Sequence, residues 1–141
     1  MKTTIYQRNY KKLEKLGIVC FLEEKHENAK LKSGSFMDLN LDRLYEEKDF
    51  VEFAMAHNYI QNGDVIADPD MQIRYYPERK MIEAVTYQDS FGYRQVYFED
   101  GKKVDLKAKR ELNTFLGQWL TNLINQRFQF QPENLVLNGD Q

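Results

Sequence analysis

The feature that most constrains the fold is an apolar stripe in residues 112–124. Its large side chains recur every three or four positions, which is the spacing of one face of an α-helix. The stripe consists of Leu112, Phe115, Leu116, Trp119, Leu120, Leu123 and Ile124. Asp105 precedes it and is suited to cap the helix N-terminus. Because such a helix buries one face, the rest of the chain must supply a layer for it to pack against, and we expect Trp119 in the core.

A second amphipathic helix is predicted at the N-terminal end, over residues 4–16. One face is apolar at helical spacing and the other is basic. The two sets are Ile5, Tyr6, Tyr10, Leu13 and Leu16, and Arg8, Lys11, Lys12 and Lys15. Gly17 is suited to end this helix, since glycine tolerates the left-handed conformation common at helix C-termini. Residues 18–34 then predict one short strand or extension followed by a turn.

Residues 36–99 alternate between polar and apolar side chains, as half-buried β-strands do. Strands are predicted over 36–45, 51–59, 71–76, 81–87 and 91–99, although 50–56 also fits two turns of helix. Turns are predicted at Asn62-Gly63-Asp64, Asp68-Pro69-Asp70, 77–80 and Asp100-Gly101. We therefore predict an α+β fold: an antiparallel sheet of four or five strands with the N-terminal and C-terminal helices packed on one face.

Length and composition indicate a single domain. The chain has 141 residues, 42% of them hydrophobic, with three prolines and seven glycines, so it differs from disordered and collagen-like chains. No internal repeat appears. We expect one α+β domain over residues 1–128 and a C-terminal tail over 129–141 that is either loosely docked or disordered.

Charge and cysteine content restrict the partners and the compartment. The 20 basic and 22 acidic residues give a net charge of −2, which removes the general electrostatic attraction to nucleic acids and argues against a polyanionic mimic of DNA. Cys20 is the only cysteine, and its apolar neighbours predict a buried, unreactive thiol with a raised pKa. The sequence has no signal peptide and no membrane-spanning run, so we expect a cytoplasmic protein without a membrane partner.

One grouping combines an imidazole with several carboxylates: His57, Asp64, Asp68 and Asp70. Such a group is a candidate metal site or acid–base centre. The aspartates, however, sit in ordinary turn sequences without the spacing of a calcium loop, so we predict that the group holds no metal. Nucleophile-elbow, phosphate-loop and zinc-protease motifs are absent from the sequence. We therefore expect no catalytic residues and no cofactor.

Tyrosine is abundant, with nine residues, and is favoured on surfaces that are both apolar and wet. Four tyrosines on successive predicted strands are candidate contacts with a partner: Tyr75, Tyr87, Tyr93 and Tyr97. The contact surface would be the sheet face that bears them or an uncovered sheet edge. The alternative is that the helices cover these rings, because a one-residue change of register exchanges the two faces.

A basic cluster near the predicted start of the last helix is a candidate nucleic-acid surface. Its members are Lys102, Lys103, Lys107, Lys109 and Arg110. The cations of the first helix would extend the patch, whereas Asp100, Asp105 and Glu111 dilute its charge. The alternative is a solvated helix end.

Several motifs resemble an uncharacterised bacterial family found on plasmids, phages and integrative elements. They are Asn62-Gly63-Asp64, Asp68-Pro69-Asp70-Met71, Asp89-Ser90-Phe91-Gly92 and Leu112-Asn113-x-Phe115-Leu116-x-x-Trp119-Leu120-x-Asn122-Leu123. The resemblance covers residues 56–128. It implies a protein carried by mobile DNA and supplies no activity, and the matching positions are mostly turn and helix-core residues.

Three functional hypotheses follow. The first is a non-catalytic protein of a mobile element that binds another bacterial protein, such as a host defence nuclease or complex, in the manner of an anti-CRISPR protein. The second is a nucleic-acid accessory factor that uses the basic cluster over 102–110. The third is an enzyme of unknown class centred on His57 and the nearby aspartates.

Overall fold

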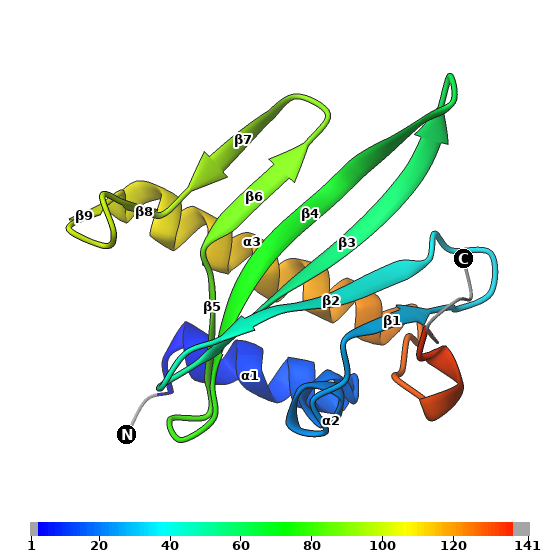
Figure 1. The fold of residues 1–141 in the computed structure, drawn as a ribbon, viewed down its shortest axis with the longest axis horizontal. Helices are drawn as coiled ribbons and strands as arrows, with labels where there is room; N and C mark the ends of the chain where they lie inside the picture. Colours follow the sequence, from blue (N-terminus) through cyan, green and yellow to red (C-terminus); the bar gives the residue numbers. More distant parts are fainter. Residues whose placement is uncertain (1–2, 137–141) are drawn as a thin grey trace.

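The computed structural model describes residues 3–136, with the side chains of 59–61 and 64–68 excepted. Its class is α+β, as predicted: two long helices lie behind one face of an antiparallel sheet, and the described residues place no helix on the other face (Figure 1). The helices are α1 (Ile5–Lys15), α2 (Ile18–Glu23) and α3 (Leu106–Asn125). The strands are β1 (Asn28–Leu31), β2 (Leu39–Glu46), β3 (Val51–Gln61), β4 (Asp64–Tyr76), β5 (Met81–Ala84), β6 (Thr86–Asp89), β7 (Gly92–Gln95), β8 (Tyr97–Phe98) and β9 (Lys103–Val104).

The main sheet has seven strands rather than four or five. Its order is β1-β2-β3-β4-β6-β7, with β5 also paired to β4, while β8 and β9 form a separate hairpin. One additional strand is β1, and another arises because residues 81–89 divide at Val85. Ile73 pairs with Ala84 whereas Asp70 pairs with Gln88, so the β5–β6 side holds one extra residue, as at a β-bulge.

The turn predicted at Asp68-Pro69-Asp70 is wrong, because these residues lie inside β4. The chain reverses only at Asn62 and Gly63, whose φ angles of 53° and 85° suit a two-residue hairpin turn. The β3–β4 register shifts between Ala56 and Asn58, opposite Pro69. A proline, which lacks an N–H, is tolerated at such an irregularity.

The helices and the core largely follow the sequence pattern. Thr4 caps α1 in a capping box with Gln7, and the Asp105 side chain accepts a hydrogen bond from the Ala108 N–H at the start of α3. Residues 51–61 form a strand, not a helix. Trp119 is confirmed as a core residue, with 5% of its surface exposed.

Two expectations for residues 18–45 are corrected. Residues 18–23 form α2 instead of an extension, and Cys20 lies on its exposed side; the pKa of Cys20 is nevertheless raised, first by desolvation and then by Glu24. The alternation over 36–45 fails at Tyr45, because the β2–β3 register shifts between Arg43 and Tyr45. This shift turns Tyr45 away from the face of Leu41.

The first part of the C-terminal tail is docked. The Phe130 N–H donates to the Leu16 carbonyl at 2.8 Å, and its ring contacts Phe21 edge-on. A short 3-10 helix (Pro132–Asn134) follows, and Leu135 bridges to Ala29 of β1. Residues 137–141 of the predicted tail lie outside the described residues.

Candidate functional site

The four candidate tyrosines lie in three different environments. Tyr75 is 3% exposed, stacks on Tyr10 and donates its hydroxyl hydrogen to Glu23, so it is a core residue and not an exposed contact. Tyr87 is half-buried on the helix side, edge-on to Phe115. Tyr93 is 54% exposed, and Tyr97 is half-buried in β8.

The sheet separates His57 from Asp70. The His57 ring packs against Trp119 and Phe128 on the helix side, with centroid distances of 5.6 and 6.0 Å. Asp70 pairs with Ala56 and therefore points to the opposite face. The side chains of Asp64 and Asp68 lie outside the described residues. Within the described part of the chain, no three His, Cys, Asp or Glu residues come together as metal ligands would.

The structure divides the basic cluster. Lys102 and Lys103 belong to the β8–β9 hairpin, where Lys103 pairs with Glu99. Lys109 turns inward to Glu83. Only Lys107 and Arg110 stay exposed on α3.

A row of four polar side chains crosses the face of the sheet opposite the helices. Cross-strand pairing aligns Tyr45, Glu52, Arg74 and Glu83 on β2, β3, β4 and β5. Their neighbours along β3 and β4 point to the helices and are buried, so strict alternation places this row on the other face. We call this face the uncovered sheet face.

Glu52 and Arg74 form the first ion pair of the row. Glu52 is 5% exposed and accepts hydrogen bonds from Arg74 Nε at 3.0 Å and from the Tyr45 hydroxyl at 2.8 Å. The Arg74 guanidinium lies 4.5 Å from the ring centre of Phe50 and 5.2 Å from that of Tyr97. Both distances are those of cation–π contacts, so two rings and one carboxylate hold the guanidinium in place.

Glu83 forms the second ion pair with Lys109 of α3. Glu83 is 6% exposed, and its carboxylate lies 3.1 Å from Lys109 Nζ. The hydroxyls of Tyr97 and Tyr76 also donate to it. The edge strand β5 lets Lys109 reach this carboxylate from the helix layer, so the row joins both layers of the fold.

Burial and neighbouring charges set the pKa directions of these groups. Burial and then Glu83 raise the pKa of Tyr97. Burial lowers the pKa of Arg74, but hydrogen bonds and charges from Glu52 and Tyr76 outweigh it, so the pKa rises. Burial likewise lowers the pKa of Lys109, and hydrogen bonds and charges from Tyr97 and Glu83 outweigh it, so this pKa also rises. Each shift strengthens the form already present at neutral pH, whereas a proton-transfer group needs a pKa near the working pH.

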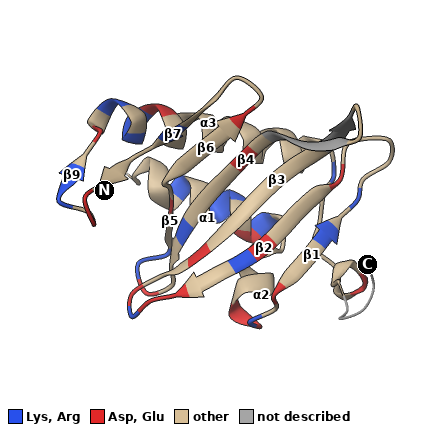
Figure 2. Ribbon diagram, turned by 45° about the horizontal axis from the view of Figure 1, so that its top comes forward, with Lys and Arg blue, Asp and Glu red and all other residues tan. Residues whose placement is uncertain are grey.

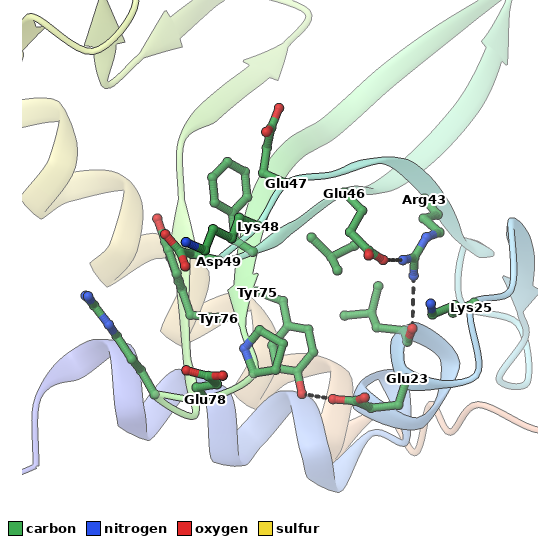
Figure 3. A pocket seen from close by; sticks show the side chains of 15 residues that line it. Glu23, Lys25, Arg43, Glu46, Glu47, Lys48, Asp49, Tyr75, Tyr76 and Glu78 are labelled. Carbon is green, nitrogen blue, oxygen red and sulfur yellow. Dashed lines mark hydrogen bonds and ion pairs between the residues drawn. The ribbon is translucent and has the colours of Figure 1, made fainter.

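Two hollows flank the β2–β3 turn, which lines both with residues 47–50. The first has a volume of about 340 Å³ and lies toward α2, where Figure 3 shows Glu23 bonded to Tyr75 and Arg43 bonded to Glu46. The second has about 670 Å³ and is bounded by Arg74, Tyr97 and the β8–β9 turn. Together they are lined by seven acidic residues, Glu23, Glu46, Glu47, Asp49, Glu78, Glu99 and Asp100, and by five basic ones, Lys25, Arg43, Lys48, Arg74 and Arg79.

Two carboxylates on the uncovered sheet face have no cation beside them. Asp42 on β2 and Asp70 on β4 stand on either side of Ala54 and Ala56, and no described residue forms an ion pair or hydrogen bond with either carboxylate. Burial raises the pKa of Asp42, and burial and then Asp42 raise that of Asp70. The face is therefore polar with an excess of negative charge.

Sequence reasoning missed the row of Glu52, Arg74 and Glu83. The available signal was the position of each charge within its strand, on the side opposite the buried residues. This signal identifies a face but not a site, because only strand order and register bring the three side chains into one line.

Comparisons with known proteins give a family and no activity. No curated protein and no solved structure matches the chain. The described residues include no helix with the length and apolarity needed to cross a membrane. A family model described as a domain of unknown function (DUF6908) matches residues 8–129. Because this match spans most of the fold, including most of α1, all of α3 and the whole main sheet, the chain belongs to the DUF6908 family.

Proposed function

We propose that this chain is a non-catalytic binding protein whose uncovered sheet face takes a basic segment of a partner protein. The observation that carries the proposal is the negative charge left without compensation there, at Asp42 and Asp70, together with the acidic excess of the second hollow, which Arg74 and Tyr97 of the same face help to line. Complementary charge steers association and selects the partner. An antiparallel sheet can leave one face in water, so solubility alone does not require a second layer over this face.

The rigidity of the row supports the same role. Arg74 is held by Glu52 and by two rings, and Glu83 by Lys109 and two tyrosines. Side chains ordered before binding lose less conformational entropy when a partner arrives. Tyr93, exposed at the β7 end of this face, extends the surface with an aromatic contact.

The finer expectations rest on the sequence resemblance. They are that the chain is carried by a mobile element and that its partner is a bacterial defence nuclease or complex, which it would antagonise as anti-CRISPR proteins do. A basic partner surface accords with this class, because nucleases present positive charge to their nucleic-acid substrates.

The test uses charge reversal on the uncovered sheet face. Tagged wild type, Asp42→Lys, Asp70→Lys and the remote control Glu133→Lys capture proteins from a bacterial lysate, followed by mass spectrometry and calorimetry with the captured protein. We expect one basic protein bound by wild type and Glu133→Lys, and at least tenfold weaker binding by the two Asp variants with melting temperatures no lower than that of wild type. Equal capture by all four proteins would refute the proposal.

A further inference from the structure

We infer that the outer surface of the helix layer, on the opposite side of the molecule from the uncovered sheet face, binds the phosphate backbone of a nucleic acid. This surface is independent of the function proposed above. It is formed by α1 and α3, which run parallel in contact: Asn9 Nδ2 donates to the Asn113 carbonyl at 3.0 Å, and Lys12 Nζ to the Gly117 carbonyl at 3.2 Å. Gly117 permits this close approach, since a Cβ there would lie 2.8 Å from Asn9 Oδ1.

A continuous groove follows the line between the two helices. It consists of two hollows of about 320 and 410 Å³ that share Ile5 and Thr114. The cations along it are Arg8, Lys12, Lys109 and Arg110, and no acidic residue is among the described residues that line it. We call this the helix groove.

Charge is divided between the two layers of the molecule. Helices α1 and α3 contain seven basic and two acidic residues, which leaves 13 basic and 20 acidic residues for the rest of the chain. Figure 2 shows Lys and Arg along α1 behind the sheet, whereas the strands in front carry both acidic and basic residues. The net charge of −2 is therefore the sum of a positive charge on α1 and α3 and a larger negative charge on the rest of the chain. At physiological salt, charges more than about 8 Å apart are largely screened, so a ligand on the helix layer responds mainly to local charge.

Among the described residues, most cations of this layer form no ion pair. On the sheet side, Arg43, Arg74 and Arg94 each form an ion pair. On α1 and α3, only Lys109 does so among the described residues. The other six keep their charge for a ligand: Arg8, Lys11, Lys12, Lys15, Lys107 and Arg110.

The spacing and chemistry of the groove fit a phosphate backbone better than a protein segment. Arg8, Lys12 and Lys15 are separated by four and three residues, so they follow one side of α1 over about 10 Å, as a row of contacts to one nucleic-acid strand requires. Between the cations the lining is mostly polar. The Gln118 and Asn122 amides can donate to phosphate and sugar oxygens, whereas the Thr114 and Thr121 hydroxyls donate to the Arg110 and Gly117 carbonyls. The aromatic core of a protein-binding patch is missing from this lining, which includes one ring, that of Tyr6.

Fluorescence anisotropy with labelled 20-nucleotide single-stranded and duplex DNA and RNA tests the inference. We expect binding at 50 mM salt that weakens steeply by 200 mM. Arg8→Glu/Arg110→Glu should bind at least tenfold more weakly, and its salt slope should fall by about 2 because two phosphate contacts are lost. The matched control Lys30→Glu/Lys48→Glu reverses two exposed cations outside α1 and α3 and should bind as wild type does.

Three results would overturn the inference. The first is no binding of any of the four probes at 50 mM salt. The second is equal weakening by the groove variant and the control variant. The third is binding of a polyglutamate peptide as tight as that of nucleic acid, which would make the ligand an acidic protein. If Arg8→Glu/Arg110→Glu does not fold by circular dichroism, Arg8→Gln/Arg110→Gln replaces it with the same expected direction.

Discussion

Four carboxylates of the uncovered sheet face differ in what surrounds them. Glu52 and Glu83 are nearly buried, and each has a cation and at least one tyrosine hydroxyl within hydrogen-bonding distance. Asp42 and Asp70 have no described partner, and their pKa values are raised. Glu83 ties the sheet to the helix layer through Lys109, and Glu52 joins β3 to β4 through Arg74. The second pair disfavours its own ionised form in the folded state, a disadvantage that a cationic partner would remove.

The pH dependence of stability should separate Asp70 from Asp89. The pKa of Asp70 is raised in the folded state. Its contribution to the free energy of unfolding therefore falls as pH rises from the ordinary pKa of about 3.9 through the folded pKa. The pKa of Asp89 is lowered by hydrogen bonds, first from the Phe91 N–H, then from the Tyr87 hydroxyl and last from the Gly92 N–H. Desolvation opposes this lowering. The contribution of Asp89 is present above about pH 3.9 and is lost as pH falls through the folded value.

Asp70→Asn should therefore be more stable than wild type at pH 7, and Asp89→Asn less stable, with both differences shrinking toward pH 2. Urea unfolding at pH 2, 3, 5 and 7 measures this, and the amides preserve the shape of each side chain. Differences of the same sign for the two variants at pH 7 would contradict the assigned environments.

At the scale of elements, one side chain of α3 takes the place of a missing strand. Strand β5 pairs with β4 on one side only. On its other side, Asn113 Oδ1 accepts from the Ala84 N–H at 2.7 Å, and Asn113 Nδ2 donates to the Ala84 carbonyl at 3.3 Å. The Asn113 carbonyl also accepts from Asn9 of α1. One residue thus ties both long helices to the sheet edge.

Asn113→Ala should destabilise the protein by about 1–3 kcal/mol, because it leaves the Ala84 N–H and carbonyl buried without their partner. Chemical denaturation measures the loss, and hydrogen exchange at the Ala84 amide should accelerate with it. Asn122→Ala, an exposed amide on the same helix, is the control and should stay within about 0.5 kcal/mol of wild type. Equal stabilities for the two variants would exclude the bridging role.

At the scale of the whole molecule, the C-terminal segment of the described chain packs against the N-terminal half. Residues 129–136 contact Leu16, Phe21 and Ala29. Of the two alternatives offered by the sequence for the tail, loose docking or disorder, this part is docked. Gly17 lies under this contact with φ of +78°, and a Cβ there would stand 2.7 Å from the Gln129 side chain. The match of the family model ends at residue 129, where this contact begins.

Phe130→Ala should cost about 3–5 kcal/mol, the range for truncating a buried phenylalanine. Thermal unfolding measures this cost, and limited proteolysis should cut the variant earlier at its C-terminal end. Glu133→Ala, an exposed position three residues later, should melt within a degree or two of wild type. A parent-like melting temperature for Phe130→Ala would show that the docked tail adds nothing to stability.

Some features could be predicted from the sequence because they depend on nearest neighbours along the chain. Helical spacing identified both long helices and the burial of Trp119, and the Asn62-Gly63 pair identified the hairpin turn. The helix over residues 18–23 was not predicted, because a six-residue apolar segment is too short to show helical periodicity. The turn predicted at Asp68-Pro69-Asp70 was wrong because the same residue types suit both a turn and an irregularity inside a strand.

The sequence by itself determined the α+β class, the order of the long elements and a net charge close to zero, all of which follow from local pattern and composition. Tertiary structure alone decided the rest: which side of the sheet each tyrosine faces, that Glu52, Arg74 and Glu83 stand in one row, and that α1 and α3 share a basic groove. The reason is physical. A side chain's face changes with one residue of register, and charges distant in sequence become neighbours only when strand order and helix packing are set.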